Sequence, residues 1–144
     1  MNTNCYIFAR GGSKGIIKKN IRNLIDKPLI AYSILLAKEI SQINKIFVST
    51  DSDEISQVAK EYGAIVIKRP DYISKDESPE WLAWQHAIKW TYNNYGKFYK
   101  FVSLPCTAPL RKKEDVEKCI DAFNSIHDVI LTMTESSRNP WFNM

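Results

Sequence analysis

Short apolar segments alternate with helix-periodic segments along this chain, and that alternation is the feature that most restricts its fold. The apolar segments lack alternating polar positions, so each one predicts a strand that is buried on both faces. We predict five strands, at residues 4–9, 45–49, 64–68, 98–104 and 129–134. Strands of this kind separated by helices predict an α/β fold, with a mainly parallel sheet covered by helices on both faces.

Helix-start signals fall between the predicted strands. Pro28 suits a first helical position, and Asp51 with Glu54 three residues later resembles a capping box. Ser78, followed by a proline and an acid, has the order that a helix start favours. These signals and the apolar spacing predict four helices, at residues 28–37, 51–62, 78–95 and 114–125.

Polar segments, several of them containing glycine or proline, follow the first four predicted strands. The carboxyl ends of parallel strands meet at one edge of a sheet, and ligands of open α/β sheets bind outside that edge. We therefore expect four segments to share one rim: residues 10–20, 50–53, 69–78 and 105–111.

The composition excludes several classes of protein. The 144 residues suit one domain, and the formal charge of +4 is too small to indicate a nucleic-acid partner. No apolar run approaches the ~20 residues of a membrane helix, and the first residues lack the pattern of a signal peptide. The three cysteines are widely spaced and predict free thiols rather than a zinc site. These features favour a cytoplasmic protein.

The segment after the first predicted strand, residues 10–20 (RGGSKGIIKKN), has the composition of a phosphate-binding loop. It combines four cations, three glycines and a serine. Glycines allow the backbone to approach phosphate oxygens, and arginine and lysine supply the opposing charge. The spacing matches neither a Walker A loop nor the GxGxxG dinucleotide motif. The same composition also fits a flexible basic turn with solvated lysines.

Five segments in order resemble the acylneuraminate cytidylyltransferase family, which comprises CMP-sialic acid synthetases and their relatives. They are IFARGGSKGIIKKNI, DKPLIAYSI, STDSDEISQVAKEYGA, the Arg69-Pro70 pair with Asp76 beyond it, and TAPLR at residues 107–111. The resemblance runs through essentially the whole chain. It implies a Rossmann-like nucleotide-diphospho-sugar transferase fold. It also implies transfer of CMP from CTP to the anomeric hydroxyl of a sialic-acid-like 2-keto-3-deoxy sugar acid, with release of pyrophosphate.

The resemblance also implies roles for individual residues. The catalytic group would be Arg10, Lys14 and Lys19, acting on the phosphates, and the sugar would contact Thr107 and Arg111. Residues implied in nucleotide binding are Ala9, Arg10, Gly11, Gly12, Ser13, Lys14, Lys19, Asn20, Arg69, Asp76 and Ser78.

Several of these positions also have a purely structural explanation. Ser78 could act only as a helix cap, Asp51 or Thr50 could cap the helix that follows them, and Arg111 could order its own loop. Lys18 is expected to be a solvated neighbour of the loop cations. Cys106 is not expected to be a nucleophile, because direct phosphoryl transfer needs none.

The resemblance finally implies partners and a larger protein. The partners would be CTP and an acidic nine- or eight-carbon sugar, with Mg²⁺ as cofactor and a homodimer as the full-length state. Residues 1–144 would be a single nucleotide-binding core without the part that carries the metal ligands and the dimer contacts, leaving an exposed apolar patch. Two alternatives stay open: a nucleotide-binding module without turnover, or the same chemistry on Kdo, amino-Kdo, legionaminate or pseudaminate.

Overall fold

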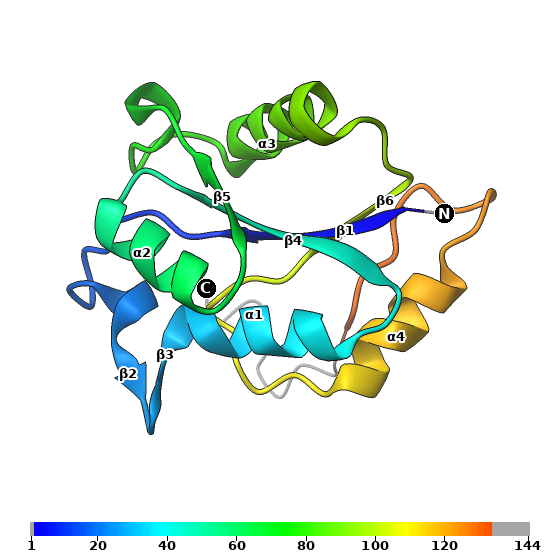
Figure 1. The fold of residues 1–144 in the computed structure, drawn as a ribbon, viewed down its shortest axis with the longest axis horizontal. Coiled ribbons are helices and arrows are strands. Elements are labelled where there is room, and N and C mark those ends of the chain that lie inside the picture. Colours follow the sequence, from blue (N-terminus) through cyan, green and yellow to red (C-terminus); the bar gives the residue numbers. More distant parts are fainter. Residues whose placement is uncertain (1, 134–144) are drawn as a thin grey trace, which may run out of the picture.

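The computed structural model describes residues 2–133 of the chain as one α/β unit (Figure 1). Its strands are β1 (Thr3–Phe8), β2 (Asn23–Leu24), β3 (Lys27–Pro28), β4 (Ile43–Thr50), β5 (Ile65–Lys68) and β6 (Lys100–Ser103). Its helices are α1 (Leu29–Glu39), α2 (Asp53–Glu61), α3 (Glu80–Tyr95) and α4 (Lys113–Ala122), with the short 3-10 turns η1 (Lys19–Ile21) and η2 (Asp71–Ile73).

Four of the strands form one parallel sheet in the order β5-β4-β1-β6. The chain passes from β1 through β4 to β5 and then returns to the opposite side of β1 to form β6. The order of strands therefore reverses beside β1, which is where open α/β sheets place their ligand crevice. The first four predicted strands and the predicted parallel α/β architecture are confirmed.

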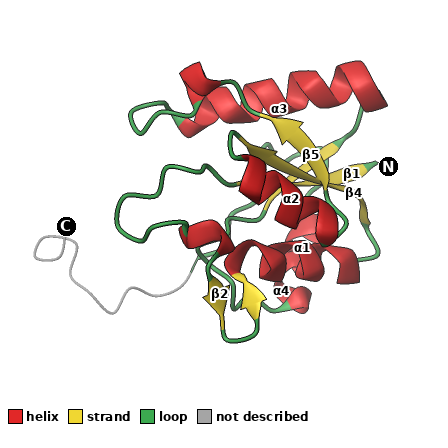
Figure 2. Cartoon of the chain, turned by 60° about the vertical axis from the view of Figure 1, so that its left-hand side comes forward, coloured by secondary structure: helices red, strands yellow, loops and turns green. Residues whose placement is uncertain are grey.

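Helices cover both faces of the sheet, as predicted. Figures 1 and 2 show α3 on one face, with α1, α2 and α4 on the other. Successive β1 side chains point to opposite faces, so each face has its own apolar core. Cys5 and Ile7 belong to the core shared with α1, α2 and α4, whereas Tyr6 belongs to the core beneath α3.

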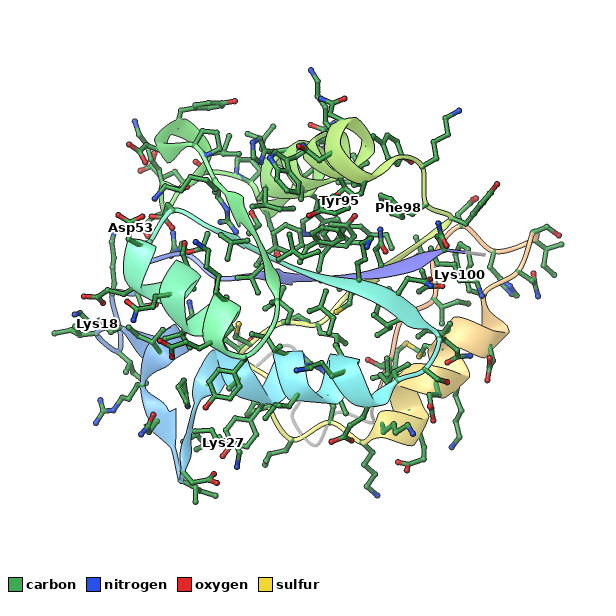
Figure 3. The ribbon with its side chains drawn as sticks, viewed as in Figure 1. Lys18, Lys27, Asp53, Tyr95, Phe98 and Lys100 are labelled. Carbon is green, nitrogen blue, oxygen red and sulfur yellow. The ribbon has the colours of Figure 1, made fainter. Side chains whose placement is uncertain are left out.

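The core beneath α3 is aromatic. The Tyr6 ring stacks on Phe47 and Phe101, with ring centroids 5.2 and 4.5 Å apart. The Tyr6 hydroxyl donates a 3.0 Å hydrogen bond to Thr91 on α3, which satisfies the one polar group of this buried ring. Figure 3 shows Tyr95 and Phe98 on this same side of the sheet. The aromatic residues of this core therefore serve packing, and they fix α3 against the sheet.

The predicted fifth strand is not formed. Residues 129–133 carry no strand in the structure, and position 134 lies outside the described residues. Val129, Leu131 and Met133 are exposed, with 67%, 77% and 94% of their surface accessible. A β-prone run becomes a strand only when a neighbouring strand satisfies its backbone groups, and within residues 2–133 none pairs with this one.

The two predicted side-chain caps are wrong in detail. Helix α2 is capped by Ser52, whose Oγ accepts a 3.3 Å hydrogen bond from the N–H of Ile55. Glu54 does not complete a capping box, since its carboxylate pairs with Lys18 at 2.7 Å. Ser78 does not cap α3 but donates to the carbonyl of Tyr72. In each case a tertiary partner competes successfully for a side chain that local sequence assigns to a cap.

Candidate functional site

A cleft of about 880 Å³ opens at the carboxyl ends of the strands, beside β1 where the strand order reverses. Its walls come from three of the four segments predicted to share this rim, and the fourth supports it from behind. The predicted rim is therefore confirmed. The lining residues are Phe8, Arg10, Ser13, Lys14, Gly15, Ile16, Lys19, Asn20, Arg69, Ile73, Lys75, Asp76, Ser78, Glu80, Ala83, Pro105, Cys106 and Thr107.

The cleft is predominantly basic. Five cationic side chains line it against two carboxylates, Asp76 and Glu80, and the cations are Arg10, Lys14, Lys19, Arg69 and Lys75. Three of the five come from the single loop that follows β1. A concave site with this excess of positive charge favours a polyanionic ligand such as a triphosphate.

The residues that directly follow β4 hold the loop after β1 in place. The Gly11 N–H donates a 2.9 Å hydrogen bond to Asp51 Oδ1. A Cβ at Gly11 would lie only 3.0 Å from the Cβ of Ser52, so the close approach of the two segments favours glycine here. This contact shows that the first glycine and Asp51 position the loop.

Asn20 closes the far end of the same loop. Its side chain is buried, and Nδ2 donates a 3.0 Å hydrogen bond to the carbonyl of Arg10. This bond fixes the backbone from which the Arg10 guanidinium extends. Of the predicted nucleotide-binding residues, Ala9, Gly11 and Gly12 do not line the cleft, and their proposed contacts stay predictions.

Arg69 forms part of the cleft wall and is 6% exposed. Its Nε donates to Ser49 Oγ at 3.2 Å, and its Nη2 donates to the Ser49 carbonyl at 2.9 Å. The guanidinium also lies over the Phe8 ring, 5.7 Å from its centroid. Burial lowers the pKa of Arg69, and the negative charges of Asp51 and Glu80 oppose that shift. These contacts hold a fixed positive charge at the base of the cleft.

Asp76 bridges two cations of the opposite wall. Its Oδ1 lies 2.5 Å from Arg10 Nη1, and its Oδ2 pairs with Lys14 Nζ. The hydrogen bond from Lys14 and the charge of Arg10 hold the pKa of this carboxyl below its ordinary value. Asp76 is therefore ionised at neutral pH, and it pairs with two cations for which the family resemblance implies contacts to phosphates.

The segment after β6 contributes Thr107 and Cys106 to the cleft. Burial raises the pKa of the Cys106 thiol to about 11, so it is protonated at neutral pH and a poor nucleophile. Arg111 does not line the cleft. Its guanidinium donates to the carbonyl of Pro105 and to Ser33 Oγ, contacts that order the loop.

Sequence reasoning missed two participants, Asp51 as a loop anchor and Lys75 as a cation of the cleft. Each stands directly after a strand or within a segment predicted for the rim. That position was the available signal, because residue type alone does not distinguish a rim cation from a solvated lysine. Lys18, in contrast, pairs with Glu54 and is absent from the cleft lining, as expected of a neighbour.

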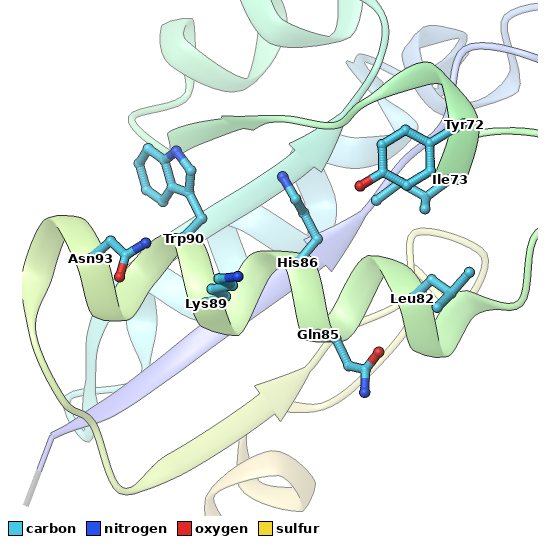
Figure 4. A pocket seen from close by; sticks show the side chains of 8 residues that line it. All are labelled: Tyr72, Ile73, Leu82, Gln85, His86, Lys89, Trp90 and Asn93. Atoms are coloured by element: carbon cyan, nitrogen blue, oxygen red, sulfur yellow. The ribbon is translucent and has the colours of Figure 1, made fainter.

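A second cavity of about 460 Å³ lies between α3 and the segment after β5 (Figure 4). It contains one cation, Lys89, with aromatic and amide side chains, which is a poor match for a triphosphate. His86 faces this cavity, and its buried Nδ1 has no hydrogen-bond partner among residues 2–133. Burial and the charge of Arg69 lower the pKa of His86, which keeps its ring neutral.

The described part of the chain offers no metal centre. No group of three or more His, Cys, Asp or Glu side chains within residues 2–133 is placed to hold a metal ion. Likewise, none of the helices in that range is long and apolar enough to cross a membrane.

Comparison with known proteins gives a consistent family. The model of the cytidylyltransferase family matches residues 5–124. Post-translational flagellin modification protein B of Campylobacter coli and CMP-N,N'-diacetyllegionaminic acid synthase of Campylobacter jejuni are each 36% identical over 143 residues, covering 97% of this chain and 61% of their own. N-acylneuraminate cytidylyltransferase of Escherichia coli is 31% identical over 134 residues, covering 92% and 31%.

The fold agrees with this assignment. A solved structure of CMP:2-keto-3-deoxy-manno-octonic acid synthetase complexed with CTP superposes with a TM-score of 0.68 at 18% identity, covering 84% of this chain and 46% of that one. The chain thus spans less than two thirds of the relatives named here. With its basic cleft at the strand ends and the family match over most of its length, the chain belongs to the cytidylyltransferase family, among homologues that include acylneuraminate cytidylyltransferases.

Proposed function

We propose that this chain is the nucleotide-binding part of an enzyme that transfers CMP from CTP to the anomeric hydroxyl of a sialic-acid-like 2-keto-3-deoxy sugar acid. The observation that carries the proposal is the basic cleft, in which Arg10, Lys14 and Lys19 of one loop face a common space. A triphosphate is the ligand whose charge this loop matches. Family membership supplies cytidine as the base.

The reaction forms a bond between the sugar oxygen and the α-phosphorus and breaks the bond from that phosphorus to pyrophosphate. Negative charge then develops on the phosphate oxygens and on the leaving group. Arg10, Lys14 and Lys19 are the groups in this chain that would stabilise that charge and align the triphosphate for in-line attack. Ser13 lines the same wall and could add a hydroxyl or backbone hydrogen bond.

The described residues do not fit a protein-held Mg²⁺ site. Magnesium prefers oxygen ligands that are free to coordinate it, and the carboxylates of the cleft are Asp76 and Glu80. Both oxygens of Asp76 are already paired with cations. We therefore assign no step to a metal held by these residues, although Mg²⁺ remains the expected companion of CTP.

The names of the relatives support the proposed class of acceptor sugar. The legionaminic acid synthase and the N-acylneuraminate cytidylyltransferase are named for two different nine-carbon sugar acids, and both align over most of this chain. A nine-carbon acid is accordingly the preferred substrate, with Kdo as an eight-carbon alternative. Thr107 lines the cleft after β6, which supports its proposed contact with the sugar. A cytoplasmic homodimer is the proposed setting for the full-length enzyme.

Nucleotide binding tests the proposal most directly. Titration calorimetry with CTP, UTP, ATP and GTP in the presence of Mg²⁺ should show a preference for CTP. Lys19→Ala should weaken CTP binding by about ten- to hundredfold, because it removes one charge-assisted hydrogen bond to phosphate. Lys18→Ala is the matched control, since Lys18 pairs with Glu54 outside the cleft.

Two results would overturn the proposal. Binding of all four nucleotides with equal affinity would remove the case for cytidine, and equal effects of the two lysine variants would remove the role of the cleft. Release of pyrophosphate from CTP is then measured with N-acetylneuraminic acid, a legionaminic acid and Kdo as acceptors. The acceptor that supports release identifies the sugar, and CTP binding without release would favour a binding module.

A further inference from the structure

The Asp76 carboxylate lies in a predominantly basic cleft and pairs with two of its cations. It lies on the segment after β5, whereas its partners Arg10 and Lys14 lie on the loop after β1. The pairing therefore joins two walls of the cleft. Each carboxylate oxygen engages a different cation, as two oxygens of a phosphate would.

We propose that Asp76 is a built-in counter-ion, which neutralises the phosphate-binding cations of the empty cleft and which a triphosphate must displace in order to bind. The inference rests on the proposed function, because it takes Arg10 and Lys14 as phosphate ligands. Asp76 then sets nucleotide affinity by competition, in place of the direct nucleotide contact that its position in the family motif suggests.

The exposure of the three side chains makes displacement feasible. Lys14 is 82% exposed, Arg10 37% and Asp76 32%, so water screens the contacts between them. Ion pairs of this kind are weak and exchange readily. A triphosphate carries several negative charges against the single charge of Asp76 and also reaches Lys19, which lines the same cleft. The ligand therefore outcompetes the carboxylate, but its affinity is lowered by the competition.

The contact also gives Asp76 a positioning effect. In the empty cleft it keeps Arg10 and Lys14 close together, although they repel one another, and so holds the cations ready for a polyanion. Competition and positioning act in opposite directions on affinity. We expect competition to prevail, since Asn20 independently anchors the Arg10 backbone and the Gly11–Asp51 bond anchors the loop.

The test uses Asp76→Asn, which removes the charge and keeps the size of the side chain. Asp71→Asn is the matched control: it removes one carboxylate from the same segment, and Asp71 does not line the cleft. Binding of CTP and of inorganic tripolyphosphate is measured by calorimetry at one fixed ionic strength. Asp76→Asn should bind both ligands about three- to tenfold more tightly, while Asp71→Asn stays within about twofold of the wild type.

A double-mutant cycle distinguishes the specific Asp76–Lys14 ion pair from a general effect of removing one negative charge near the cleft. In a Lys14→Gln background, the gain from Asp76→Asn should shrink, because one of the two cations that Asp76 neutralises is gone. Circular dichroism of each variant confirms that the fold is retained.

Each outcome has a defined meaning. Equal binding by Asp76→Asn and Asp71→Asn, or a gain unchanged by Lys14→Gln, would overturn the counter-ion role. Weaker binding by Asp76→Asn would overturn it too, because positioning of the cations or a direct contact with the ligand would then outweigh competition. Failure of the wild-type chain to bind CTP or tripolyphosphate would instead reject the proposed function, and the inference with it.

Discussion

Charged residues of the cleft differ in how firmly the structure holds them. Arg69 is buried and bonded to Ser49 through two nitrogens, so its charge is a permanent part of the wall. Lys14 is mostly exposed, and its one ion pair is with Asp76 among the described residues. A fixed cation and a mobile one suit different tasks, since the first defines the base of the site and the second can follow a ligand.

Gly11 provides a prediction at the scale of a single residue. In Gly11→Ala the new methyl would lie 3.0 Å from Ser52 Cβ, so either the loop or the start of α2 must shift. We expect the free energy of unfolding to fall by about 1–2 kcal/mol, as for overpacking elsewhere. Urea unfolding measures the change.

Gly12→Ala is the control, because a Cβ there meets nothing within 4 Å. Its unfolding free energy should stay within about 0.5 kcal/mol of the wild type. Equal destabilisation by both alanines would show that loop flexibility, rather than the contact with Ser52, accounts for the effect.

At the scale of elements, the start of α2 links the fold to the cleft. Ser52 caps the helix, and the preceding Asp51 accepts the Gly11 N–H. The helix terminus and the loop after β1 are thereby joined through two consecutive residues. Loss of the cap should consequently affect the loop after β1 as well as the first turn of α2.

Ser52→Ala tests this junction. Loss of the capping oxygen leaves the Ile55 N–H without its side-chain partner, which costs about 1 kcal/mol of unfolding free energy. The measurement is again urea unfolding, with Ser41→Ala as a control at an exposed turn position. If both variants unfold at the same urea concentration, the cap contributes nothing measurable.

At the scale of the whole molecule, the exposed apolar run at residues 126–133 stands out. Ile126, Val129, Leu131 and Met133 all have most of their surface accessible. Strand β6 is at one end of the sheet order, so its outer edge pairs with no other strand within residues 2–133. Exposed apolar patches and unpaired strand edges both favour association. This chain should therefore self-associate in solution as its concentration rises.

Replacing Val129 and Leu131 together with lysine should suppress that association without lowering the melting temperature, because neither side chain is buried. Sedimentation velocity over a range of concentrations measures the change. Ile25→Lys is the control, since Ile25 is also exposed, at 90%, but lies at the tip of the β2–β3 hairpin. A wild-type chain that sediments as a monomer at every concentration would refute the prediction.

The layered α/β architecture, the first four strands and the rim on which the cleft lies can all be predicted from the sequence alone. Apolar runs and helical periodicity record burial, which is the largest favourable contribution to folding, so they survive in the sequence as a readable pattern. The cations after β1 were readable for a similar reason, because they are close together in the chain.

The hydrogen-bond and ion-pair partners of the polar side chains, in contrast, depend on the three-dimensional fold. The Asp51 carboxylate accepts a hydrogen bond from the Gly11 N–H instead of capping a helix, and the Arg111 guanidinium donates to the carbonyl of Pro105. The Asp76 carboxylate pairs with two cations more than sixty positions earlier in the chain. Alternative hydrogen bonds and ion pairs differ in free energy by only about 1 kcal/mol, so small differences in the distance between the groups select among them. Those distances are fixed by the packing of the whole sheet, and no local pattern encodes them.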